Sequence, residues 1–151
     1  GMEVKLLKRQ SDKITAVYCR LARYDGELDA LAGQYQQDAL LEYAATHGLK
    51  HPQLFCDWGF SGTDDRRPEY QRMLQEVRAG NVSSIVVKDL SRLSRNHAAC
   101  FELVGCILPK YGVTLHSVKD GPGVSEAFSE HRQLIEFFQS LYCQSQRGGR
   151  K

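Results

Sequence analysis

Two hydrophobic patterns alternate along the chain. Short runs of β-branched, aromatic or apolar residues predict strands at 14–19, 52–58, 84–87 and 113–118. Between these runs, apolar residues recur at helical spacing, which predicts helices at 32–47, 68–80, 96–108 and 126–145. Strands that alternate with helices in this way are typical of right-handed crossovers between parallel strands. The sequence therefore predicts an α/β fold with a mainly parallel sheet of four to five strands flanked by helices.

The same patterns carry expectations about burial. The unbroken apolar run 84–87 is typical of a strand that is buried on both faces. The apolar positions of the first two helices are expected to face the sheet because they share one side of each helix. They are Tyr35, Ala39, Leu40, Tyr43 and Ala44 in the first helix, and Tyr70, Met73, Leu74 and Val77 in the second. The third helix is expected to end near Pro109 and Gly112.

Length and composition narrow the class of protein. The chain has 151 residues, of which 42% are hydrophobic and 25% are charged, as expected of about one soluble domain. A disordered tail, a collagen-like fibre and a multidomain enzyme are excluded. No apolar run is long enough to span a membrane and no signal-peptide profile is present, so we expect a cytoplasmic protein with no membrane partner. Gly1, before Met2, is interpreted as the scar of a cleaved tag.

Charge and cysteine content exclude further classes. The formal net charge is only +2, which argues against a module that grips nucleic acid by bulk charge. The five cysteines form no C-x-x-C pair and the five histidines lie at no ligand spacing, so neither a metal site nor a disulfide framework is expected. Most of the cysteines are expected to be small buried hydrophobic residues. Phosphate-loop and dinucleotide-binding motifs are absent, and we expect no cofactor.

Functional groups in parallel sheets gather beyond the carboxyl ends of the strands. That rule selects the segments 20–25, 57–67, 88–95 and 119–123. Five arginines lie in these segments: Arg20, Arg66, Arg67, Arg92 and Arg95. The planar guanidinium binds phosphate oxygens in a bidentate manner and stays charged, so a convergent cluster suits a phosphodiester under attack. Taken singly, each could instead be a solvated surface side chain.

Three motifs, met in this order, resemble the catalytic domain of the serine recombinases, the resolvase/invertase superfamily. They are Tyr18-Cys19-Arg20-Leu21, the loop 57–63 followed by Arg67-Pro68, and the segment 87–96. The resemblance runs from about Ile14 to Tyr142 and is closest to the large serine recombinases of transposons and phages. The resemblance implies that the catalytic domain spans residues 14–147. The tag scar and an N-terminal extension occupy residues 1–13, and residues 148–151 form a C-terminal end without the DNA-binding region.

The resemblance implies an activity and partners. In that family a serine hydroxyl attacks a phosphate of double-stranded DNA at a recombination site, giving a 5′-phosphoserine link and a free 3′-hydroxyl. Strands are then exchanged and rejoined within a tetramer assembled from dimers. The predicted last helix resembles the start of the helix that dimerises such domains. The resemblance implies a site-specific DNA recombinase that uses no metal or cofactor.

The family's site residues can be carried over by position. The arginines that hold the scissile phosphate match Arg20, Arg67, Arg92 and Arg95. Gln36 matches the glutamine of the first helix, and Asp57 matches the acidic residue that ends the second strand. Ser91 stands where relatives have Asp or Ser. Two of these also have structural interpretations, since Gln36 could be a solvated helix residue and Asp57 could pair with an arginine to hold its loop.

One position departs from the family pattern. The nucleophilic serine of Tyr-x-Arg-x-Ser falls on Ala22, which has no oxygen to attack phosphorus. Loss of a serine nucleophile costs about a millionfold in rate in a well-studied hydrolase, or about 8 kcal/mol. Rescue by Ser61, Ser91 or Ser94 is not expected, because relatives have small polar residues there in other roles. Either Ala22 is an engineered substitution, or a natural copy has lost cleavage.

Two other functions are compatible with parts of the sequence. A non-catalytic partner that associates with an active recombinase through its last helix would explain the missing serine beside retained arginines. A small-molecule phosphate-binding protein would explain only the arginines at the strand ends. Trp58, which follows the second strand's core, is interpreted as loop packing rather than base stacking.

Overall fold

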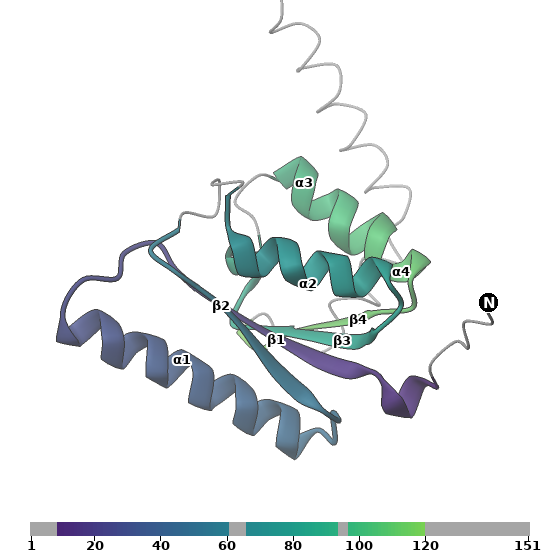
Figure 1. The fold of residues 1–151 in the computed structure, drawn as a ribbon, viewed down its shortest axis with the longest axis horizontal. Coiled ribbons are helices and arrows are strands. Elements are labelled where there is room, and N and C mark those ends of the chain that lie inside the picture. The colour runs from purple at the N-terminus through teal and green to yellow at the C-terminus, as the bar shows by residue number, and fades with distance from the viewer. Residues whose placement is uncertain (1–8, 61–65, 94–96, 120–151) are drawn as a thin grey trace, which may run out of the picture.

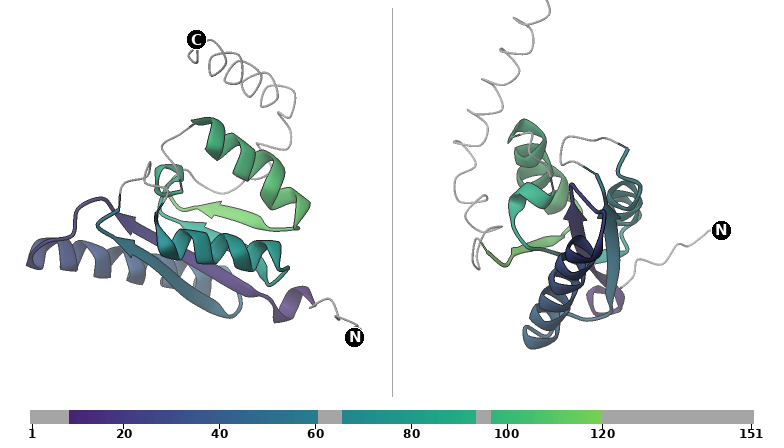
Figure 2. Two further views of the ribbon diagram at one scale, coloured as in Figure 1. Left: turned by 45° about the horizontal axis from the view of Figure 1, so that its top comes forward. Right: turned by 90° about the vertical axis from the view of Figure 1, so that its left-hand side faces the viewer.

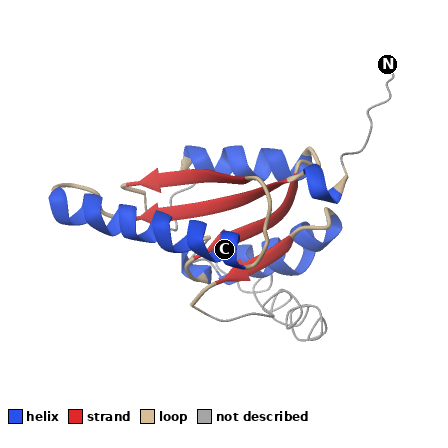
Figure 3. Cartoon of the chain, turned by 90° about the horizontal axis from the view of Figure 1, so that it is seen from below, coloured by secondary structure: helices blue, strands red, loops and turns tan. Residues whose placement is uncertain are grey.

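The structure is a computed structural model that describes residues 9–60, 66–93 and 97–119. In this part of the chain four parallel strands form one sheet, in the order β2-β1-β3-β4. The strands are β1 (Ile14–Leu21), β2 (Pro52–Trp58), β3 (Val82–Val87) and β4 (Thr114–Ser117). All four arrowheads lie on the same side in Figure 3. The predicted parallel α/β fold is confirmed.

Helices cover both faces of this sheet (Figures 1 and 2). On one face lies α1 (Glu27–Thr46), and on the other lie α2 (Pro68–Arg78) and a helical segment further along the chain. That segment consists of α3 (His97–Glu102), the π-helical turn η3 (Leu103–Ile107) and α4 (Leu108–Lys110). The described part of the chain also contains two 3-10 turns, η1 (Gln10–Asp12) and η2 (Leu90–Arg92). None of the helices described is long and apolar enough to cross a membrane.

Some element boundaries differ from the predicted ones. The first helix begins at Glu27 rather than at 32, because Gly26 turns the chain with φ 103° and Asp29 accepts a hydrogen bond from the Asp25 amide. The third helical segment ends at Lys110, near Pro109 and Gly112 as predicted, and Pro109 stands in the first turn of α4 where a missing N–H is tolerated. The helix predicted at 126–145 lies outside the described residues.

The predicted inner face of α1 is right in part. Leu40 and Ala44 are buried and Tyr43 is half-buried, as predicted. Tyr35 is instead 80% exposed and Ala39 is exposed, whereas Gly33 and Gln36 are buried. The Trp58 ring lies so close to Gly33 that a β-carbon there would be 3.2 Å from it. Since this indole takes the space beside Gly33, the helix turns Gln36 inward and Tyr35 outward.

Two apolar clusters hold the layers together. Between α1 and the sheet, the buried residues are Val17, Cys19, Leu40 and Val86. The larger cluster, on the opposite face, joins β1 to β4 with α2 and the α3–α4 segment, and includes Met73, Leu74 and Val77 of the predicted face of α2. β3 contributes to both clusters, so its burial on both faces is confirmed.

The expectation that most cysteines are buried is only partly right. Cys19 is buried, Cys56 and Cys100 are half-buried, and Cys106 is exposed. None of these four forms a disulfide within the described part of the chain, and Cys143 lies outside the described residues.

A buried and an exposed leucine of α1 test the observed orientation of this helix. Leu40 is 1% exposed and Leu28 is 81% exposed. We expect Leu40→Ala to lower the free energy of unfolding by about 2–5 kcal/mol, because it removes buried methyl groups and leaves a cavity. Leu28→Ala is the matched control and should change it by no more than about 0.5 kcal/mol. Urea denaturation followed by circular dichroism measures both, and equal losses would contradict the orientation.

Candidate active site

The site forms where β1 continues beyond its pairing with β3. β1 pairs with β2 through Leu21, but its pairing with β3 ends at Val17. The last residues of β1 therefore have no strand beside them on that side. The turn η2, which follows β3, takes this place and brings Arg92 next to Arg20.

Arg20 lies at the centre of the site and is fully buried. Its Nε donates to the backbone carbonyl of Arg92 at 3.1 Å, and its NH1 donates to the carbonyl of Phe60 at 3.1 Å. A buried guanidinium needs such acceptors, because an unsatisfied charged donor is costly away from water. Arg20 therefore ties the ends of β1, β2 and β3 to one another.

Arg67 reaches the same carbonyl from the start of α2. It is 4% exposed, and its NH1 and NH2 donate to the carbonyls of Arg92 and Leu93 at 3.1 and 2.7 Å. Its guanidinium carbon lies 3.8 Å from the centre of the Tyr70 ring, a cation–π contact. Pro68 keeps the backbone of Arg67 out of the helix, so the side chain points back toward the strand ends.

Arg92 supplies the third guanidinium. Its NH1 donates to the carbonyl of Arg20 at 3.3 Å. Its Nε is buried and has no hydrogen-bond partner among the residues that the structure describes. A buried charged donor of this kind favours an anion as its partner.

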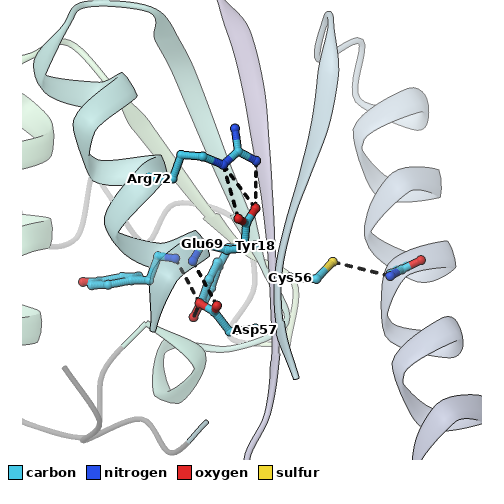
Figure 4. A network of polar contacts seen from close by, with 7 residues as sticks. Tyr18, Cys56, Asp57, Glu69 and Arg72 are labelled. Atoms are coloured by element: carbon cyan, nitrogen blue, oxygen red, sulfur yellow. Dashed lines mark hydrogen bonds and ion pairs between the residues drawn. The ribbon is translucent and has the colours of Figure 1, made fainter. Parts of the chain in front are cut away.

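Asp57 balances part of this positive charge through Tyr18 (Figure 4). The Tyr18 hydroxyl donates to Asp57 Oδ2 at 2.7 Å and accepts from Arg67 NH1 at 3.1 Å. Asp57 also accepts from the amides of Glu69 and Tyr70 at 3.0 and 2.9 Å, which places its charge at the N-terminus of α2. Burial and then the nearby carboxylate of Asp57 raise the pKa of Tyr18, so the hydroxyl keeps its proton.

Gln36 holds the backbone of Arg20 from α1. Its Oε1 accepts from the Arg20 amide at 3.1 Å, and its Nε2 donates to the Arg20 carbonyl at 3.4 Å. This amide takes the place of a neighbouring strand where β3 has ended. Gln36 is buried, so its interpretation as a solvated helix residue is wrong.

Ala22 is exposed at the end of this rigid segment. The carbonyl of the preceding Leu21 accepts from the amides of Gly59 and Phe60 at 2.7 and 3.2 Å. Two residues after Ala22, the Tyr24 ring stacks on the Trp58 ring with centroids 5.3 Å apart. These contacts flank residue 22 on both sides. Trp58 is the last residue of β2 rather than a loop residue, and its ring packs against Tyr24 and beside Gly33 of α1.

Five further residues that the sequence singled out remain: Ser61, Arg66, Ser91, Ser94 and Arg95. Ser91 is in the turn η2, between Leu90 and Arg92. Arg66 is exposed, unlike its neighbour Arg67. Arg95, Ser61 and Ser94 lie outside the described residues.

The sequence reasoning missed three partners of the arginines. These are the hydroxyl of Tyr18, the ring of Tyr70 and the carbonyl of Phe60. A signal existed for Tyr18, because it is two residues from Arg20 in β1 and so lies on the same face of the strand. The carbonyl acceptors gave no such signal in the sequence, because every residue has a backbone carbonyl.

A comparison with family profiles decides the family. The profile described as "Resolvase, N terminal domain" matches residues 15–147. The chain belongs to the resolvase family of serine recombinases. A comparison with curated proteins gave no match.

Solved structures resemble this resolvase domain in fold. The N-terminal catalytic domain of TP901-1 integrase has 24% sequence identity and a TM-score of 0.71, over 86% of this chain and 99% of that chain. A resolvase family site-specific recombinase from Streptococcus pneumoniae has 24% identity and a TM-score of 0.59, over 90% and 99% of the two chains. A serine recombinase from Sulfolobus solfataricus has 20% identity and a TM-score of 0.58, over 87% of each chain.

The Tyr18 hydroxyl can be tested by removing it alone. Tyr18→Phe should lower the free energy of unfolding by about 2 kcal/mol, because a buried hydrogen bond to a charged carboxylate is lost. Tyr35→Phe is the matched control at an 80% exposed position and should have almost no effect. Urea denaturation measures both variants. An unchanged free energy for Tyr18→Phe would mean that the hydroxyl does not link Asp57 to Arg67.

Proposed function

We propose that this resolvase domain binds a phosphodiester of double-stranded DNA in its arginine cluster during site-specific recombination, and that Ala22 prevents it from cutting the strand. The observation that carries this proposal is the convergence of Arg20, Arg67 and Arg92 at the end of β1, the strand that the exposed Ala22 directly follows. In a serine recombinase that position supplies the attacking oxygen.

The cluster suits the charge changes of phosphoryl transfer. An attacked phosphodiester gains negative charge on its oxygens, and buried donors that are fixed beforehand stabilise such charge without rearranging. The buried Nε of Arg92 is a donor of this kind. Arg20 and Arg67 add positive charge behind it while their own hydrogen bonds keep them in place. No metal is needed for this role.

Attack requires an oxygen at position 22. Alanine has none, while the backbone before it is held by the hydrogen bonds of Arg20 and Leu21. We therefore propose that phosphate binding is retained and that covalent 5′-phosphoserine formation is lost. Dimers, and a tetramer at synapsis, are the assembly that the family resemblance implies for the intact protein.

The alanine at position 22 also favours a second function. A domain that binds the phosphate without cleaving it could pair with an active homologue and change synapsis, as a non-catalytic partner. Mixed-subunit crosslinking with an active homologue tests this role, and failure to associate with any such homologue would exclude it.

Restoring the oxygen is the test of the main proposal. We expect Ala22→Ser, in a protein that joins this chain to a DNA-binding region, to form a covalent adduct with DNA carrying its recombination site. The adduct should be resolved as a slower band on a denaturing gel, and its phosphate should be attached to the introduced serine. Ala32→Ser, at an exposed position of α1, is the matched control and should form none.

The negative outcome is informative when binding is measured in parallel. If Ala22→Ser forms no adduct while Arg92 is crosslinked to the DNA backbone, the assigned nucleophile position is wrong. If neither adduct nor contact is found, the proposed phosphate site itself is wrong.

A further inference from the structure

Two thiols face each other on neighbouring strands beside the site. Cys19 of β1 and Cys56 of β2 are register partners in the parallel pair. Both belong to the apolar cluster that α1 covers, with Cys19 fully buried and Cys56 half-buried. Neighbouring strands lie about 4.8 Å apart, inside the range of about 4.4–6.8 Å between Cα atoms that a disulfide bridges.

The two sulfurs have different surroundings. The Cys56 sulfur accepts a hydrogen bond from Gln37 Nε2 at 3.4 Å, as Figure 4 shows, and its register partner in β1 is Cys19. The neighbouring Cys19 thiol and then the Gln37 hydrogen bond favour the thiolate, so the pKa of Cys56 is lowered. The neighbouring Cys56 and burial raise the pKa of Cys19, which keeps its proton. Since a thiolate is the reactive form of cysteine, Cys56 is the more nucleophilic of the pair.

We propose that Cys19 and Cys56 form an oxidisable dithiol, in which a peroxide oxidises Cys56 and Cys19 then closes a disulfide between β1 and β2. The function of the arginine cluster is not needed for this proposal.

The chemistry balances with hydrogen peroxide as the only oxidant. The Cys56 sulfur attacks one peroxide oxygen, the O–O bond breaks, and the products are a sulfenic acid and water. The Cys19 sulfur then attacks the Cys56 sulfur, and the hydroxyl leaves with the Cys19 proton as a second water. Two thiols lose two electrons and two hydrogens, and one peroxide becomes two waters.

The cross-link would form one residue before the site. Arg20 follows Cys19, Asp57 follows Cys56, and these two residues are the next register partners. Figure 4 shows Cys56 and Asp57 pointing to opposite faces of the sheet. The disulfide would therefore fix the distance between the two strand ends from the α1 side, without entering the arginine cluster.

Peptide mapping of the full, folded chain tests the dithiol. The reduced protein is treated with hydrogen peroxide, then denatured, alkylated and cut with trypsin. We expect loss of two alkylatable thiols and a single cross-linked species that joins the peptide 14–20 to the peptide 51–66. Its mass should be two hydrogens below the sum of the two reduced peptides, and a thiol reductant should separate them.

Single substitutions test which cysteine reacts with the peroxide and which one closes the disulfide. Cys19→Ser should stop the reaction at a Cys56 sulfenic acid that dimedone traps, and Cys56→Ser should leave Cys19 reduced. Cys106→Ser, at the exposed cysteine, is the matched control and should form the cross-link as the unchanged chain does.

The proposal is overturned if the unchanged chain oxidises Cys56 while Cys19 stays alkylatable. It is equally overturned if Cys56 joins another cysteine, or if Cys106 oxidises before either. These readouts on the unchanged chain hold even if a variant fails to fold.

Discussion

The backbone carbonyl of Arg92 accepts hydrogen bonds from two guanidiniums, those of Arg20 and Arg67, both at 3.1 Å. The Arg92 side chain in turn donates to the carbonyl of Arg20. These hydrogen bonds join the end of β1, the turn after β3 and the start of α2. It forms only because β1 leaves β3 at Val17 and so gives the turn η2 room beside it.

Bringing like charges together out of water is unfavourable unless other groups compensate. Here carbonyl oxygens accept the N–H groups, the Tyr70 ring lies against Arg67, and Asp57 supplies a negative charge through the Tyr18 hydroxyl. The compensation stops short of Arg92, whose Nε is buried without a partner among the described residues. Arg92 contacts the carbonyl of Arg20, two residues before the exposed Ala22, and this links the energetics of the fold to its proposed function.

Much of this arrangement could be predicted from the sequence, because it depends on periodicity and on strand ends. The apolar runs predicted the parallel strands. Arg20, Arg67 and Arg92 were selected because functional groups gather beyond the carboxyl ends of such strands. The orientation of α1 could be predicted only in part. Leu40 and Ala44 face the sheet as predicted, but the choice between Tyr35 and Gln36 depends on side chains from other elements, such as the Trp58 ring beside Gly33. The carbonyl acceptors could not be predicted, because they are defined by tertiary structure and by no residue type.

The position of a bound phosphate tests the central claim most directly. A crystal structure of this chain with duplex DNA that carries its recombination site would give the distance from Ala22 to the nearest phosphorus. We predict that one phosphate lies against Ala22 with an oxygen within hydrogen-bond distance of the Arg92 guanidinium. A DNA backbone bound elsewhere, with the Arg92 guanidinium in contact with protein groups alone, would contradict the account.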